Sequence, residues 1–373
     1  MKKIDSIQEH FREVETVKEY QGYTYSVGEA LTIVILGSIC GLRNASQIQQ
    51  WADDKRIRKF LQKHFGIEQI PCYYWLLCLL KLIKPESLNR CFIKWVQAMH
   101  PEDDVEMTLS FDGKSIRSTG AMQGYEKPLH IISAHIAKLG LTLGQKTVSE
   151  KSNEIPALRD LLELLQVKGC MIVADALHCQ KETARAIVGE KADYLLSVKD
   201  NQETLKENIA DYVQEESLRK TMDCAVTVEK NGGRIEKRTG YATCDVDWIY
   251  GKKEWAGLVC FGAIHRQCHT KGGASSEWHY YISSRPLTAS ELLRFARMEW
   301  SVESMHWLLD VHFGEDFFRV EDDAVQQNLN MVRKIALNTI RTFKTNSSSK
   351  RAFSKIMLDC LLDPLTFLLL LQS

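Results

Sequence analysis

The order of strand-like and helix-like segments between residues 105 and 198 restricts the fold more than any other feature of this sequence. Three short β-prone segments follow one another, and the chain then alternates helix, strand, helix and strand. Pro156 is expected to open the first of these helices at its N1 position. Strands are expected over 107–111, 129–136, 141–148, 170–174 and 194–198, and helices over 157–167 and 181–188. This order predicts an α/β protein with a mixed sheet covered by helices.

The flanking segments have different patterns, which suggests several domains in a chain of 373 residues. Helices are expected over 27–42, 46–65 and 72–83, and prolines place the first boundary near residue 101. Further helices are expected over 290–311 and 326–343. The predicted parts are an N-terminal helical, DNA-binding domain (1–100), the first part of the α/β core (101–204), a β-rich insertion (205–287) and C-terminal helices that complete the core (288–373).

The composition is that of an ordinary globular protein, with 48 Lys and Arg against 48 Asp and Glu. No apolar stretch reaches the roughly 20 residues of a membrane-spanning helix, and no secretory signal is visible. We therefore expect a cytoplasmic protein without a membrane partner. The charges are distributed unevenly: residues 1–100 hold 14 basic and 10 acidic residues (+4), and residues 101–200 hold 12 and 15 (−3).

Two aspartates follow apolar segments that we expect to be strands. Asp112 follows Leu109-Ser110-Phe111, and Asp175 follows Met171-Ile172-Val173-Ala174. Carboxylates at neighbouring strand ends, facing a crevice, are suited to share divalent cations. The alternative is that each one caps a turn or a helix, Asp112 especially, because Asp-Gly is a turn signal. Spacing alone leaves both possibilities open.

A third carboxylate has to come from elsewhere, and Glu303 is the candidate. Trp300 and Trp307 lie three residues before it and four after it, on nearly the same helix face. This spacing predicts that the carboxylate turns toward the protein body. Glu299 lies on the same face and is the nearest rival, and a solvated helix acid is the plain alternative for Glu303.

Several motifs of this chain, taken together, resemble those of the DDE transposases of insertion sequences of the ISAs type, the group that includes the H-repeat-associated proteins. The resemblance covers nearly the whole chain. The matching stretches are 111–117 (FDGKSIR), 151–156 (KSNEIP), 175–180 (DALHCQ), 193–202 (DYLLSVKDNQ), 233–238 (GRIEKR), 300–303 (WSVE), 306–311 (HWLLDV) and 315–316 (ED). The chain departs from the family's usual residues at Ser304 and Glu299, and segment 72–76 lacks an arginine often found there.

This resemblance implies a ribonuclease-H-like core in which Asp112, Asp175 and Glu303 form the catalytic, metal-binding triad. Two Mg²⁺ ions, with Mn²⁺ able to substitute, would be held with Asp112 as the bridging ligand. Water would free a 3′-hydroxyl at the end of the element, and this hydroxyl would then attack target DNA. No nucleotide cofactor is expected, since the chain has no GxxxxGK[ST] phosphate loop.

The implied partner is double-stranded DNA, both the terminal repeats of the element and the target, bound by a homo-oligomer that brings two ends together. Basic and amide side chains near the motifs are the candidates for holding the DNA backbone. They are Lys114, Arg117, Lys199, Asn201, Gln202, Arg234 and Arg238. The alternation of Arg234, Glu236 and Arg238 also fits a mixed-charge strand face in water. The alternative functions are an inactive or host-adopted DNA-binding remnant and a nuclease that joins no strands.

Overall fold

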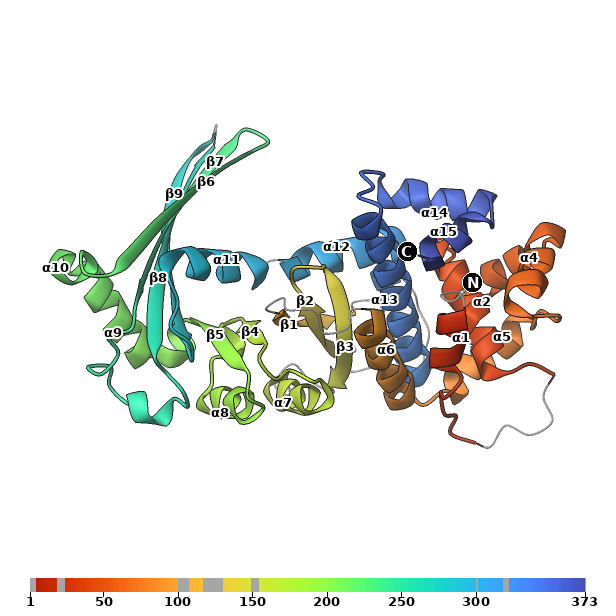
Figure 1. The fold of residues 1–373 in the computed structure, drawn as a ribbon, viewed down its shortest axis with the longest axis horizontal. Helices are drawn as coiled ribbons and strands as arrows, with labels where there is room; N and C mark the ends of the chain where they lie inside the picture. Colours follow the sequence, from red (N-terminus) through yellow and green to blue (C-terminus); the bar gives the residue numbers. More distant parts are fainter. Residues whose placement is uncertain are drawn as a thin grey trace.

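The structure is a computed structural model that describes residues 5–18, 24–99, 107–116, 130–148, 154–270, 272–299, 301–317 and 322–372. It is elongated, with a helical end that holds both chain termini, central strands, and long curling strands at the other end (Figure 1). None of its described helices is both long and apolar enough to cross a membrane.

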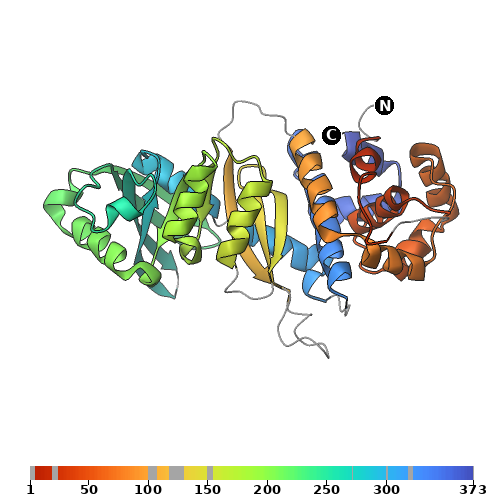
Figure 2. The ribbon, with the colours of Figure 1, turned by 90° about the horizontal axis from the view of Figure 1, so that it is seen from below.

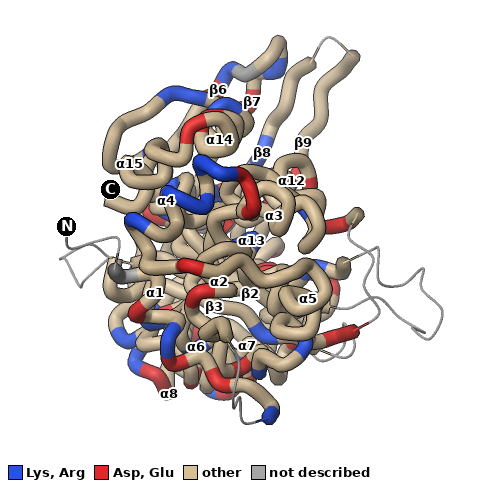
Figure 3. The backbone as a smooth tube through the Cα atoms, turned by 90° about the vertical axis from the view of Figure 1, so that its right-hand side faces the viewer, with Lys and Arg blue, Asp and Glu red and all other residues tan. Residues whose placement is uncertain are grey.

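The N-terminal part is helical, as the sequence pattern predicts. The expected helix over 46–65 is two helices, because Asp54 accepts hydrogen bonds from the backbone N–H groups of Arg56 and Ile57 and so starts a new one. Basic and acidic residues are interspersed over this end (Figure 3). The helices are α1 (Asp5–Phe11), α2 (Val27–Ile39), α3 (Ala45–Ala52), α4 (Lys55–Phe65), α5 (Tyr73–Leu82) and α6 (Pro85–Met99).

Five central strands form the predicted mixed sheet in the order β3-β2-β1-β4-β5. The first three pair antiparallel, and β1, β4 and β5 run parallel. This order and these directions are those of a ribonuclease-H-like core, so the predicted fold class is confirmed. The strands are β1 (Thr108–Ser115), β2 (His130–Ile136), β3 (Leu141–Val148), β4 (Met171–Ala174) and β5 (Asp193–Val198).

Helices α7 (Glu154–Leu164) and α8 (Lys181–Gly189) lie side by side over one face of these strands (Figure 2). Their apolar residues share a core with Phe111 of β1 and Ala174 of β4. Helix α7 begins at Glu154, so Pro156 is its third residue and not its first. Proline is tolerated there because N–H groups in the first turn have no partner within the helix.

The β-rich block continues the same sheet, because β9 (Gly273–Ser283) pairs antiparallel with β5. Strands β8 (Cys260–Thr270), β7 (Arg234–Thr243) and β6 (Asp223–Asn231) follow outward and complete nine strands among the described residues. Helix α9 (Glu203–Gln214), followed by the short α10 (Glu216–Arg219), contacts β8 and β9, whereas α11 (Ala289–Glu299) contacts β6, β7 and β8. The block is therefore an extension of the core sheet.

The C-terminal helices link the two ends of the molecule. The helix expected over 290–311 is two helices, α11 and α12, on either side of residue 300, which lies outside the described residues. The long α13 packs against α2, α5, α6 and β3, so it joins the N-terminal helices to the sheet. The remaining bounds are α12 (Ser301–Phe313), α13 (Asp323–Asn346), α14 (Phe353–Leu362) and α15 (Thr366–Gln372).

Candidate active site

The register of the sheet brings the two predicted aspartates level with each other. In the parallel pair β1 and β4, Phe111 lies opposite Ala174, so the next residues are Asp112 and Asp175. Neighbouring strands lie about 4.8 Å apart, and successive side chains alternate between faces. Both aspartates therefore lie on the face opposite the one that α7 and α8 cover.

Asp112 is not at the end of its strand, contrary to the prediction, and Asp112-Gly113 is not a turn. Strand β1 continues to Ser115 because β2 pairs with it beyond the point where β4 ends. Gly113 is required here for packing. A Cβ at this position would come within 2.6 Å of the Glu154 and His130 side chains.

Asp175 caps a turn, which is one of the two roles that the sequence leaves open for it, and it also lies level with Asp112. It caps the short 3₁₀ helix η3 (Ala176–His178), and its Oδ1 accepts a hydrogen bond from the Leu177 N–H at 3.1 Å. Two residues predicted to bind DNA brace this turn from the other side. Asn201 donates to the Ala176 carbonyl at 2.6 Å, and Gln202 donates to the Cys179 carbonyl at 3.0 Å.

Helix α11 crosses the sheet face on which the aspartates lie, and its last residue is Glu299. Leu292, Phe295 and Ala296 of this helix share a core with strands β4 and β5. Burial, and next to it the charge of Asp175, raises the pKa of Glu299 to about 7, while nearby Lys199 lowers it. The rival acid thus lies within electrostatic range of the site, and Lys199, a predicted DNA contact near it, is exposed.

Glu303 lies in the first turn of α12, and its predicted orientation is wrong. It is exposed, and Trp307 on the same helix face is 59% exposed, so this face points to solvent and not into the protein. Glu303 instead lines a pocket beside the sheet. The structure leaves the carboxylate accessible, and Trp300 lies outside the described residues.

The acids of this site repel one another. Burial, then the charge of Asp175, and to a smaller extent the charges of Glu154 and Glu303 together raise the pKa of Asp112 to about 6. Carboxylate oxygens are the ligands that hard divalent cations prefer, and a cation would relieve this repulsion. The donor set therefore fits Mg²⁺ in chemistry and charge. Within the described part of the chain, no three His, Cys, Asp or Glu side chains converge on one metal position in this conformation.

Lys114, a predicted DNA contact, forms ion pairs within the protein. Its ammonium group donates to Asp310 of α12 at 2.5 Å and to Glu315, which is 1% exposed. Lys114 lies two residues after Asp112 on β1, and Asp310 lies seven residues, or two helical turns, after Glu303 on α12. This ion pair therefore fixes the strand that carries Asp112 against the helix that carries Glu303.

Two further groups adjoin the acids: Glu154, which is buried, and His306, which is partly exposed and which the sequence offers only as a second-line candidate. Glu154 is 3% exposed and lies 2.5 Å from Nε2 of His130, whose Nδ1 is 2.8 Å from Ser115 Oγ. His306 Nδ1 lies 3.4 Å from an Asp112 oxygen, and burial lowers the pKa of His306 to about 4, so the ring is neutral near pH 7. The KSNEIP and HWLLDV motifs were the available signals for both.

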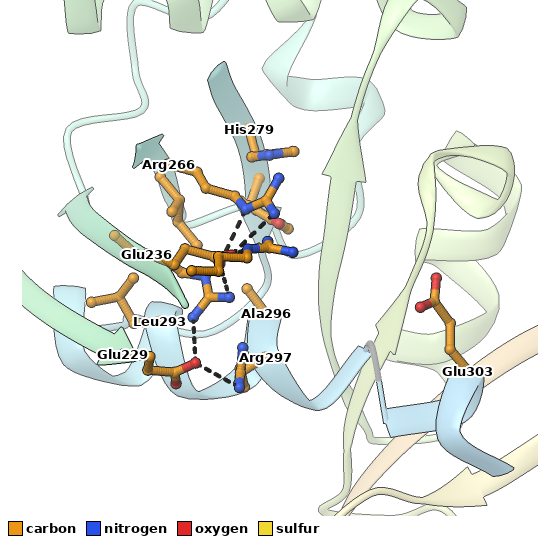
Figure 4. A pocket seen from close by; sticks show the side chains of 12 residues that line it. Glu229, Glu236, Arg266, His279, Leu293, Ala296, Arg297 and Glu303 are labelled. Atoms are coloured by element: carbon orange, nitrogen blue, oxygen red, sulfur yellow. Dashed lines mark hydrogen bonds and ion pairs between the residues drawn. The ribbon is translucent and has the colours of Figure 1, made fainter. Parts of the chain in front are cut away.

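Arg234 and Arg238 lie in the same pocket as Glu303, with two further arginines, Arg266 of β8 and Arg297 of α11 (Figure 4). The alternative interpretation of the sequence was that the face of β7 with Arg234, Glu236 and Arg238 is exposed to water. The structure instead buries Glu236, with 7% of its side chain exposed, among three guanidinium groups. Arg117, the remaining predicted contact, lies outside the described residues.

Comparison with known proteins adds independent information. The model of the Transposase DDE domain family matches residues 104–339, and that of the DDE_Tnp_1-associated family matches residues 8–96. The chain is 30% identical to the "H repeat-associated putative transposase YhhI" of Escherichia coli (strain K12), over 95% of this chain and 96% of that protein. It is 29% identical to the "Putative transposase YncI" of Escherichia coli O157:H7, over 95% and 93%. A solved piggyBac transposase synaptic complex with hairpin DNA aligns over 100% of this chain and 79% of that chain, with a TM-score of 0.47 and 10% identity.

Proposed function

The chain belongs to the Transposase DDE domain family, and on that premise we propose that it cleaves phosphodiester bonds at insertion-sequence ends and joins the freed 3′-hydroxyl to target DNA. One observation of the structure supports this most. The register of β1 and β4 holds Asp112 level with Asp175, and α11, which covers that face, leads directly into the helix that carries Glu303.

Asp112, Asp175 and Glu303 are the residues that would hold divalent cations, Mg²⁺ or Mn²⁺. When bound, a pair of such ions activates the attacking oxygen and stabilises the leaving 3′ oxygen. Asn201 and Gln202 hold the turn of Asp175, and Lys114 sets α12 against β1, so we assign these three residues to positioning. His306 is neutral near pH 7 and places a ring nitrogen beside Asp112 without adding a positive charge that would repel a cation.

The proposed partner is double-stranded DNA. The proposed assembly is a homo-oligomer that holds the two ends of the insertion sequence together, and its proposed location is the cytoplasm. Exposed Lys199, with Arg234 and Arg238, supports contact with the DNA backbone next to the acids. The proposal keeps residues 1–100 as the DNA-binding domain, residues 101–204 and 288–373 as the catalytic core, and 205–287 as its insertion.

The test is cleavage and joining by the purified protein on DNA that carries the inverted repeats flanking its gene. We expect Mg²⁺-dependent cleavage followed by strand joining, and loss of both in Asp112→Asn, Asp175→Asn and Glu303→Gln with DNA binding retained. Glu163→Gln, an exposed glutamate of α7, is the control. Binding without cleavage by the unaltered chain would identify an inactive remnant, and cleavage without joining a nuclease. An active Glu303→Gln beside an inactive Glu299→Gln would overturn the assignment of the third acid.

A further inference from the structure

The pocket that Glu303 lines has a volume of about 390 Å³, within the roughly 300–1,000 Å³ typical of ligand sites. Its opposite wall comes from β6, β7, β8, β9 and α11. Figure 4 shows Glu303 on α12 across from Arg297 and from the cluster around Glu236. A molecule bound in this pocket would therefore lie between a set of guanidinium groups and one of the three proposed catalytic acids.

The cluster holds more positive charge than its own carboxylates balance. Arg234, Arg238 and Arg266 all form ion pairs with Glu236, Arg266 at 3.1 Å. Each guanidinium has five N–H donors, whereas one carboxylate offers about four lone pairs. Three guanidinium groups around one carboxylate thus leave a local charge of about +2 before the outer carboxylates are counted, and more donors than Glu236 alone can satisfy.

The outer carboxylates reduce this excess but do not cancel it. Arg297 pairs with Glu229 at 2.7 Å, Glu229 also lies 3.4 Å from Arg238, and Arg266 pairs with Glu277. Four arginines against these three glutamates give this wall of the pocket a net charge of +1, and Glu303 on the opposite wall brings the pocket as a whole to neutrality. Arg234 and Arg297 keep 45% and 54% of their side chains exposed, so their planar donor groups are accessible from the pocket.

We propose that this arginine pocket, formed by Arg234, Arg238, Arg266 and Arg297, binds backbone phosphates of the DNA strand that enters the site. Glu236 is a positioning residue that orders three of the guanidinium groups. Planar guanidinium groups suit the paired oxygens of a phosphate, and the positive charge of this wall supplies the attraction. This inference rests on the proposed function, since it takes DNA as the substrate. It extends that function by assigning to the insertion the binding of the DNA strand beside Glu303.

Arg234→Gln and Arg297→Gln are the informative variants. Both side chains are about half exposed, and Glu236 keeps Arg238 and Arg266 as partners after either change. Arg351→Gln is the matched control, because its side chain is also 54% exposed and forms one ion pair, with Asp359. Arg266→Lys keeps the charge but removes the forked donor.

Binding of the full chain to a fluorescein-labelled DNA duplex is measured by anisotropy in EDTA across a salt series. We expect Arg234→Gln and Arg297→Gln each to weaken binding about tenfold and to reduce the slope of log K against log salt by about 0.9. Arg266→Lys should lose affinity and keep the slope, and Arg351→Gln should match the wild type. Urea unfolding checks that each variant is folded.

An unchanged affinity, an affinity loss without a change in slope for Arg234→Gln and Arg297→Gln, or an equal loss in Arg351→Gln would each overturn the phosphate assignment. These outcomes leave the proposed function standing whenever the wild type binds the duplex and cleaves it with Mg²⁺. Failure of the wild type to bind DNA at all would overturn both.

Discussion

Glu299 provides a direct measurement of the repulsion among the acids. Burial and the neighbouring carboxylates raise its pKa from 4.5 to about 7, and Gln in its place cannot ionise. At 1.36 kcal/mol per pKa unit, keeping this group ionised in the folded state costs about 3 kcal/mol at most. The side chain is half-buried, and screening by solvent reduces the expected cost to about 1 to 2 kcal/mol.

The sign of the pH dependence follows from the raised pKa. Between pH 4.5 and 7 the folded state binds more protons at Glu299 than the unfolded state, so the contribution of this group to the stability of the wild type falls as the pH rises. Glu299→Gln removes this loss. The stability of the variant relative to the wild type should therefore grow from pH 5 to pH 8, by about 1 to 2 kcal/mol. Mg²⁺ should narrow the gap, because a bound cation offsets the same repulsion.

Urea unfolding followed by tryptophan fluorescence, at pH 5 and pH 8 and with EDTA or Mg²⁺, measures these differences. Glu163→Gln on the exposed face of α7 is the matched control and should show no such trend. A difference between Glu299→Gln and wild type that does not change with pH would refute the electrostatic reasoning. Because Glu303 is the proposed third acid, Glu299→Gln should also keep cleavage activity.

Three further substitutions test the packing around the site. Lys114→Met leaves buried Glu315 without its lysine partner, so the free energy of unfolding measured in urea should fall by about 3 to 5 kcal/mol. Adding Glu315→Gln to Lys114→Met should restore part of this loss. A loss below about 1 kcal/mol in Lys114→Met would contradict the structural role of this ion pair. Asn201→Ala removes the hydrogen bond to the Ala176 carbonyl and should lower the free energy of unfolding by about 1 kcal/mol. The cleavage rate of the folded variant should also fall, because the turn that carries Asp175 loses this support. An unchanged cleavage rate would rule out a positioning role for Asn201. Gly262→Ala places a Cβ 2.5 Å from Leu292 and 2.7 Å from the Tyr241 carbonyl, so calorimetry should show a loss of about 1 to 3 kcal/mol, and a neutral result would mean that α11 can move away from the sheet.

The periodicity of the sequence was sufficient to predict the elements of the core and the kind of sheet they form. Apolar segments of strand length, followed by helix–strand units, have few arrangements that bury their surfaces, and the order β3-β2-β1-β4-β5 is one of them. Periodicity did not predict the break at Asp54, because a capping side chain in an amphipathic stretch leaves the apolar spacing intact. Nor did it predict that β9 pairs with β5, since pairing between distant strands leaves no local mark in the sequence.

The candidate site was less predictable than the fold, because it depends on which partners each side chain finds. Lys114, Asn201 and Gln202 are polar residues beside motif acids, and the sequence cannot distinguish a DNA contact from a bond within the protein. Their partners, Glu315, Ala176 and Cys179, lie 201, 25 and 23 residues away. The exposed face of α12 was mispredicted for a related reason, since aromatic flanks indicate burial only where another element covers them.

The position of the proposed insertion in the chain separates Glu303, the proposed third acid, from the two aspartates in sequence. After β5 the chain builds α9, α10 and four strands, and only then returns through α11, which packs on β6, β7 and β8 as well as on β1 and β4. The insertion thereby delivers α11 onto the face that carries Asp112 and Asp175, a face that α7 and α8 leave uncovered. Because α11 carries Arg297 and leads into α12, the same helix sets the distance between the arginine pocket and Glu303. A change that tilts α11 should therefore affect DNA binding and catalysis together, whereas a change confined to either wall of the pocket should separate them.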